Sequence, residues 1–148
     1  MSNNTASLPP VLEKLVQKLK RQSDPKRRYE LLIWLAQKLE PIADQLKVPD
    51  NRVPGCTSQV FISARLEDGK IYYTGDADAQ IVKGLVTLLV QGLSGLPSQD
   101  ILAVDPAFIQ DSGLNISLSP SRANGFYNIL QMMKQKAALL DQAADLAS

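Results

Sequence analysis

An antiparallel hairpin is encoded by Gln59-Val60-Phe61-Ile62-Ser63-Ala64-Arg65-Leu66, which is followed by Asp68-Gly69 and then by Lys70-Ile71-Tyr72-Tyr73-Thr74. In the first segment every second residue is aliphatic, which is the two-residue period of a strand with one face on a core. Asp-Gly is a strong signal for a tight reverse turn. The last segment then continues as the return strand.

Helical patterns flank this hairpin on both sides. Apolar residues recur at helical spacing over about 8–19, and Ser23-Asp24-Pro25 reads as the start of a second helix over about 26–39. Gly75-Asp76-Ala77-Asp78-Ala79 is expected to open a broadly apolar, nearly buried central helix. Short helical pieces are expected near 98–103 and 105–111, a third short strand at 114–118, and a long helix after Ser119-Pro120-Ser121-Arg122.

This order of elements predicts the α+β class rather than alternating βαβ units. We expect a small antiparallel sheet of about three strands, packed with N-terminal, central and C-terminal helices. A chain of 148 residues is typical of one domain. We therefore predict a single domain over 1–148, with short flexible tails at about 1–7 and 141–148.

Composition and charge exclude several kinds of partner. Hydrophobic residues make up 45% of the chain, charged residues 21%, and the formal net charge is +1. So small a net charge gives no broad field for nucleic acid or anionic membranes, and neither is expected as a partner. No aliphatic run approaches the roughly 20 residues that span a bilayer, and the first residues do not resemble a signal peptide. Together with a single unpaired cysteine, this pattern predicts a cytoplasmic protein.

Cys56 is the only cysteine, and the chain contains no histidine. A cysteine hydrolase normally needs an imidazole as base and general acid, and one thiol cannot form a CxxC pair or an ordinary zinc or iron–sulfur site. The residues before it, Val48-Pro49-Asp50-Asn51-Arg52-Val53-Pro54-Gly55, are typical of a shaped loop. Gly55 permits a tight turn with no side chain beside the sulfur. The thiol is either a buried filler or a displayed group whose chemistry another molecule completes.

Four other residues have weaker claims to chemistry. Asp76 and Asp78 could form an acid–base pair, but acidic residues in the first turn of a helix also stabilise its dipole, and we favour that structural role. Arg122 lies at a predicted helix start, where it could pair with an acidic residue or hold an anion. Ser58 has no base to activate it, so nucleophilic serine chemistry is not expected.

Three stretches together resemble the SufE family of sulfur-acceptor proteins, which includes the CsdE proteins. They are Asn51-Arg52-Val53-Pro54-Gly55-Cys56-Thr57-Ser58-Gln59-Val60, Gly75-Asp76-Ala77-Asp78-Ala79-Gln80-Ile81-Val82-Lys83-Gly84-Leu85 and Leu118-Ser119-Pro120-Ser121-Arg122-Ala123-Asn124-Gly125. The resemblance covers about residues 26–136. Departures are small, chiefly Phe61 where the family often has tryptophan and Thr57 where glutamine is frequent.

The resemblance implies a SufE/IscU-like fold and a function. Cys56 would accept persulfide sulfur from a partner cysteine desulfurase, stimulate that enzyme, and pass the sulfur to a downstream scaffold for iron–sulfur cluster assembly. Pyridoxal phosphate would belong to the desulfurase, and this chain would need no cofactor or metal of its own. It would act as a sulfurtransferase-like accessory subunit, without independent hydrolase or redox activity. Gly55, Ser58, Asp78 and Arg122 would support the loop or the docked partner.

Two alternatives come from other classes of function. One is an iron–sulfur scaffold in which Asp76 and Cys56 are ligands. The other is a non-catalytic adaptor in which Cys56 is only packed. Thiol exchange needs just one accessible thiol and a docking surface, which favours the carrier.

Overall fold

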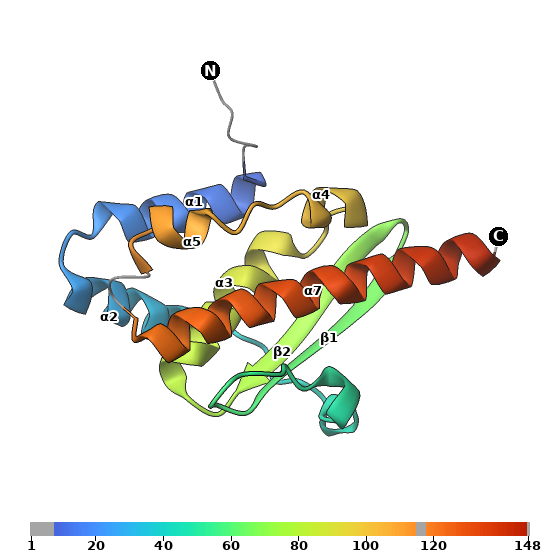
Figure 1. Ribbon diagram of the computed structural model, residues 1–148, viewed down its shortest axis with the longest axis horizontal. Helices are drawn as coiled ribbons and strands as arrows, with labels where there is room; N and C mark the ends of the chain where they lie inside the picture. The colour runs from blue at the N-terminus through green and yellow to red at the C-terminus, as the bar shows by residue number, and fades with distance from the viewer. Residues whose placement is uncertain (1–7, 115–117, 148) are drawn as a thin grey trace, which may run out of the picture.

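The hairpin forms at the predicted place in the computed structural model, which describes residues 8–114 and 118–147 (Figure 1). Strands β1 (Val60–Glu67) and β2 (Lys70–Ala77) pair antiparallel, with Val60 opposite Ala77 at one end and Glu67 opposite Lys70 at the other. Asp68 and Gly69 both have positive φ, 52° and 76°, which is the backbone of a two-residue hairpin turn. The predicted Asp-Gly turn is thus confirmed.

The predicted helices are present, with shifted ends. The chain forms α1 (Pro10–Arg21), α2 (Pro25–Ala36), the short 3₁₀ turns η1 (Asp44–Leu46) and η2 (Pro49–Asn51), α3 (Gln80–Leu93), α4 (Ser98–Leu102), α5 (Phe108–Asp111) and α7 (Pro120–Ala147). The Asp24 carboxylate accepts a hydrogen bond from the backbone amide of Lys26 at 3.0 Å and so caps α2 at its predicted start. In the part of the chain that the structure describes, no helix combines the length and apolar character needed to cross a membrane.

The expected start of the central helix is wrong. Residues 75–77 continue strand β2 instead, and α3 begins only at Gln80. The ladder extends because Phe61 and Val60 pair with Asp76 and Ala77. Gly75 suits this crowded place, since a Cβ there would lie 2.9 Å from side-chain atoms of Ile62 and Val86. Asp76 is therefore a strand residue, and its predicted role in a first helical turn is withdrawn.

Two further predictions concern the C-terminal third of the chain. Of the expected third strand at 114–118, residues 115–117 lie outside the described residues. Leu114 is helical and its carbonyl accepts from the amide of Leu118 at 2.8 Å, so the two ends are not extended. The sheet of the described residues has two strands. Helix α7 continues through Ala147, so the described part of the segment predicted as a tail is helical.

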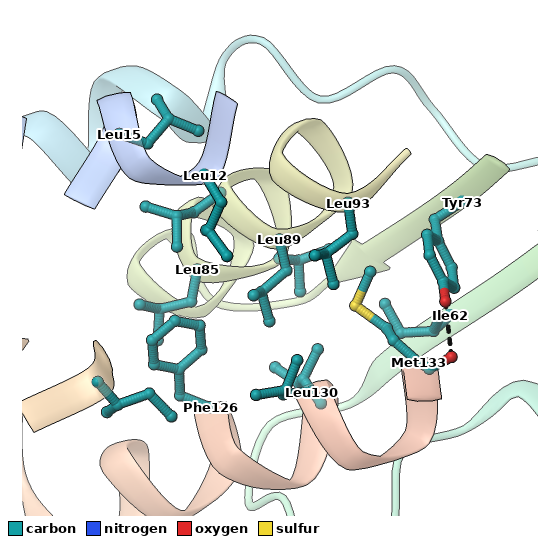
Figure 2. Packing of buried hydrophobic residues seen from close by; sticks show 14 of the residues in the cluster. Leu12, Leu15, Ile62, Tyr73, Leu85, Leu89, Leu93, Phe126, Leu130 and Met133 are labelled. Atoms are coloured by element: carbon teal, nitrogen blue, oxygen red, sulfur yellow. Dashed lines mark hydrogen bonds between the residues drawn. The ribbon is translucent and has the colours of Figure 1, made fainter. Parts of the chain in front are cut away.

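Helix α3 is the centre of the core, as its broad apolar arc predicts. It packs against α1, α2, β2 and α7, and Leu85, Leu88, Leu89 and Leu93 are fully buried. Figure 2 shows side chains of this cluster facing Phe126, Leu130 and Met133 of α7. The Tyr73 hydroxyl donates to the carbonyl of Met133 at 2.6 Å and ties the hairpin to α7. The sheet, α3 and α7 thus pack as one unit, and the loop that carries Cys56 leads into strand β1.

Candidate functional site

The loop that carries Cys56 follows η2, is held against strand β1 at its entry, and leads into β1 at its end. Its entry is held because the Val53 amide donates to the carbonyl of Val60 at 2.9 Å and Arg52 forms a bridge with Phe61. Gly55 has a φ of +77°, a conformation that favours glycine. A Cβ on Gly55 would also lie only 2.6 Å from Nδ2 of Asn128 in α7. Gly55 therefore provides both the turn and the close approach to a helix.

Cys56 lies half-buried at the first turns of α7. Its thiol faces the carbonyl of Gly125, with 3.7 Å between sulfur and oxygen, a weak hydrogen bond with S–H as donor. A Cβ on Gly125 would approach Sγ to 3.4 Å, so glycine there leaves room for the sulfur. The adjoining pocket is small, about 10 Å³, and is lined by Cys56, Thr57, Ser58, Val82, Ser121, Arg122 and Gly125. That is space for about one water molecule, too little for a substrate of any size.

The structure brings the predicted supporting residues to this loop. Ser58 and Arg122 line the same pocket as the thiol. Asp78 lies at the exit of the loop, where its carboxylate accepts from the Gln59 amide at 3.0 Å and its own amide donates to the Gln59 carbonyl at 3.2 Å. Arg122 is in the first turn of α7, and its amide donates to the Ser119 hydroxyl at 3.3 Å. The roles of these side chains in sulfur transfer stay predictions.

Asp76 is engaged elsewhere, so the acid–base pair with Asp78 has no support. Its carboxylate forms ion pairs with Lys47 at 3.4 Å and Lys83 at 3.7 Å, which link β2 to the residue after η1 and to α3. Among residues 8–114 and 118–147, no group of three or more His, Cys, Asp or Glu side chains could hold a metal ion. The scaffold alternative, with Asp76 and Cys56 as ligands, gains nothing from this geometry.

Sequence reasoning missed the contribution of α7 beyond Arg122. Gly125 lies under the sulfur, Asn128 lies against Gly55, and Lys136 contacts the start of the loop. Gly125 was part of the third family-like stretch, but no local pattern showed that it faces a thiol 69 residues earlier. Helical spacing from Arg122 could have placed Gly125 on the same side, which was the one available signal.

The environment of Cys56 disfavours the thiolate relative to the thiol. Burial raises the pKa of the Cys56 thiol above its ordinary value, because the charged thiolate loses solvation. The neighbouring carbonyl of Gly125 accepts a hydrogen bond from the S–H group and offers no donor to a thiolate. The thiolate is the nucleophile in thiol exchange, so the resting site holds Cys56 in its less reactive form.

We expect Cys56 to be alkylated by iodoacetamide more slowly in the folded chain than in urea, with a pH profile shifted upward. Burial raises the pKa of Cys56 in the folded state. The stability that this thiol contributes is therefore fully present below its unfolded pKa and is lost as pH rises through its folded pKa. Rates measured between about pH 7 and 10 test this. Equal folded and unfolded rates at every pH would contradict the half-buried thiol.

These features define a class: an α+β protein with one loop thiol, whose covalent chemistry another molecule must complete. Residues 13–137 match the family model SufE, described as an Fe-S metabolism associated domain. The chain belongs to the SufE family, as the three stretches predict, and the family places it in iron–sulfur metabolism.

Several relatives agree with this assignment. The chain is 57% identical to an uncharacterized SufE-like protein of Synechocystis, over 89% of this chain and 83% of that one. It is 42% identical to SufE-like protein 1, chloroplastic/mitochondrial, of Arabidopsis thaliana and to the cysteine desulfuration protein SufE of Plasmodium vivax. The matches cover 90% and 86% of this chain but 36% and 52% of those longer proteins.

The fold has a close counterpart among solved structures. A solution structure of a hypothetical protein from Thermus thermophilus superposes with a TM-score of 0.80 at 26% sequence identity. The superposition covers 92% of this chain and 99% of the other. The α+β class and its arrangement of helices are thereby confirmed.

Proposed function

We propose that this chain accepts persulfide sulfur from a partner cysteine desulfurase onto Cys56, stimulates that enzyme, and passes the sulfur on for iron–sulfur cluster assembly. The observation that carries the proposal is the setting of Cys56, the only thiol of a SufE-family chain, half-buried on a loop against α7. The relatives named for cysteine desulfuration support the same activity. The desulfurase would supply pyridoxal phosphate and the carbon–sulfur cleavage.

The transfer is a thiol exchange that balances without an added oxidant. The Cys56 thiolate attacks the outer sulfur of the partner's cysteine persulfide. The new bond joins Sγ of Cys56 to that sulfur, the old sulfur–sulfur bond breaks, and the partner's cysteine leaves as a thiolate that takes up a proton. Cys56 then carries one sulfane sulfur. A downstream scaffold would receive it by the same kind of step.

We further propose that docking draws Cys56 out of its resting pocket. The thiol faces a carbonyl, and the pocket of about 10 Å³ leaves no space for a partner's persulfide to reach it in place. The Cys56 thiol is joined to α7 by a weak hydrogen bond, so its displacement breaks no strong interaction. Cytoplasm is the compartment we propose, because a reducing environment keeps a single thiol available.

The adaptor alternative is favoured by one observation, the half-burial of Cys56. A carrier and an adaptor differ in whether stimulation of the desulfurase requires the Cys56 thiol. We expect the native chain to raise alanine formation from cysteine severalfold when it is added to a SufE-dependent desulfurase without reductant. A chain alkylated at Cys56 after brief unfolding, then refolded, should give no increase.

Binding of the alkylated chain to the desulfurase is measured beside turnover, so that lost docking is separated from lost chemistry. An adaptor would stimulate equally with the thiol blocked. That result, with binding intact, would overturn the carrier function.

A further inference from the structure

One face of α7 follows the loop that carries Cys56, called here the cysteine loop, from its base at residues 50–53 to its tip at Cys56. Gly125 contacts Cys56, the Asn128 side chain lies where a Cβ on Gly55 would project, and Lys136 reaches Asn51. At about 100° per residue, positions 125, 128 and 136 lie on the same side of the helix. The loop therefore runs along α7 in the opposite direction to the helix.

The two stretches have comparable lengths. From 125 to 136 the helix rises about 16 Å at about 1.5 Å per residue. From 51 to 56 the chain can span about 17 Å when extended at about 3.3 Å per residue. Only four residues separate Asn51 from Cys56, so the position of the base limits where Cys56 can reach.

Lys136 holds that base. Its ammonium donates to Oδ1 of Asn51 at 2.7 Å and lies 3.4 Å from the carbonyl oxygen of Asp50. The Asn51 side-chain amide in turn donates to the carbonyl of Leu46 at 2.8 Å, which closes the preceding turns. Burial lowers the pKa of Lys136, and the Asp50 carboxylate acts in the opposite direction. The contact is thus partly shielded from water, where charged hydrogen bonds are stronger.

The base and the tip are held very differently. At the base, the lysine contact acts beside the Arg52–Phe61 bridge and the Val53 amide hydrogen bond. At the tip, the interaction of Cys56 with α7 is a weak S–H bond at 3.7 Å. A pull on the loop would release the tip and leave the base in place.

We propose that Lys136 is a positioning residue that fixes the base of the cysteine loop on α7, so that only residues 54–58 move when Cys56 leaves its pocket. The use of this anchoring in sulfur transfer rests on the proposed sulfur-acceptor function, but the anchoring itself needs no desulfurase. Without Lys136, residues 44–53 would loosen together with the tip. Cys56 would then be exposed more often and aimed less accurately at a partner.

The test measures iodoacetamide alkylation of Cys56 in the full chain, with hydrogen exchange of residues 44–53. Lys136→Met retains the apolar stem and removes the donors, and we expect hydrogen exchange of residues 44–53 to be about three- to tenfold faster, as for loss of one such hydrogen bond, with alkylation of Cys56 accelerated in the same direction. Lys136→Arg should restore most of the native rate. Asn51→Ala removes the same bond from the other side, together with the bond to the Leu46 carbonyl, and should have an effect at least as large as that of Lys136→Met, which keeps the test valid if one variant fails to fold.

Lys134→Met is the matched control. Lys134 lies on the same helix, and burial lowers its pKa as well, but its ammonium donates to the carbonyl of Val104, away from the loop. Its loss should leave the alkylation rate unchanged. The proposal is overturned if Lys136→Met alkylates at the native rate, or if Lys134→Met accelerates alkylation equally. Sulfur acceptance measured on the same variants tests the proposed function separately, since the anchoring can hold even if no sulfur is transferred.

Discussion

A chain carrying Cys56→Ser should accept no radiolabelled sulfur from cysteine in the presence of a cysteine desulfurase. Serine is nearly isosteric with cysteine, and its hydroxyl can still donate to the carbonyl of Gly125. The fold should therefore be kept, with an unfolding midpoint close to the native value. Oxygen cannot form the sulfur–sulfur bond by exchange, and no second thiol exists in the chain. The expected loss is complete rather than partial.

The matched control is Ser58→Ala, which alters another residue of the same pocket and leaves the thiol in place. It should still acquire label. Labelling of Cys56→Ser at the native level would show that the sulfur resides elsewhere, and the carrier account would then be wrong.

The largest expected effect on stability comes from Gly84→Ala, at the crossing of α2 and α3. A Cβ on Gly84 would lie 2.1 Å from the carbonyl oxygen of Leu32 and 2.7 Å from its carbonyl carbon. These are backbone atoms of a packed helix, so they cannot rotate away. Alanine normally favours a helix over glycine by about 1 kcal/mol, but overpacking costs about 1–3 kcal/mol and more where backbone must move.

We expect Gly84→Ala to lower the free energy of unfolding by about 2 kcal/mol, which corresponds to a fall in melting temperature of about 4–8 °C. Urea titration and thermal melts followed by circular dichroism measure it. Gln91→Ala, at an exposed position of α3, should stay within about 0.5 kcal/mol of the native chain. Stability of Gly84→Ala equal to or above native would contradict the close helix crossing.

The local elements of this fold could be predicted because their signals are local. The alternation from Val60 to Ile62 and the Asp-Gly turn define the hairpin, and the apolar arc of 81–93 predicts a buried helix. The boundary at Gly75 was wrong because Gly-Asp also suits a strand-to-helix turn. Residues 75–77 extend strand β2 because they pair with β1, and a local pattern does not show such pairing.

The site could be predicted only in part, for the same reason. Cys56 stands out by being the only cysteine, and the family resemblance led to Asp78 and Arg122 beside its loop. The role of Lys136 could not be found from periodicity, because a polar residue on a helix gives the same sequence pattern whether it faces solvent or a loop. Its contact with Asn51 joins residues 85 positions apart and exists only in the folded chain.

Peptide mass spectrometry can locate the transferred sulfur on Cys56. The chain is incubated with cysteine desulfurase and cysteine, trapped with iodoacetamide, and digested. A sulfur carrier should show an added mass of about 32 Da, from one sulfur, relative to the alkylated peptide, on the peptide containing Cys56 and nowhere else. A Cys56 peptide with no added sulfur, after complete turnover of cysteine by a desulfurase that binds this chain, would show that Cys56 is not the carrier.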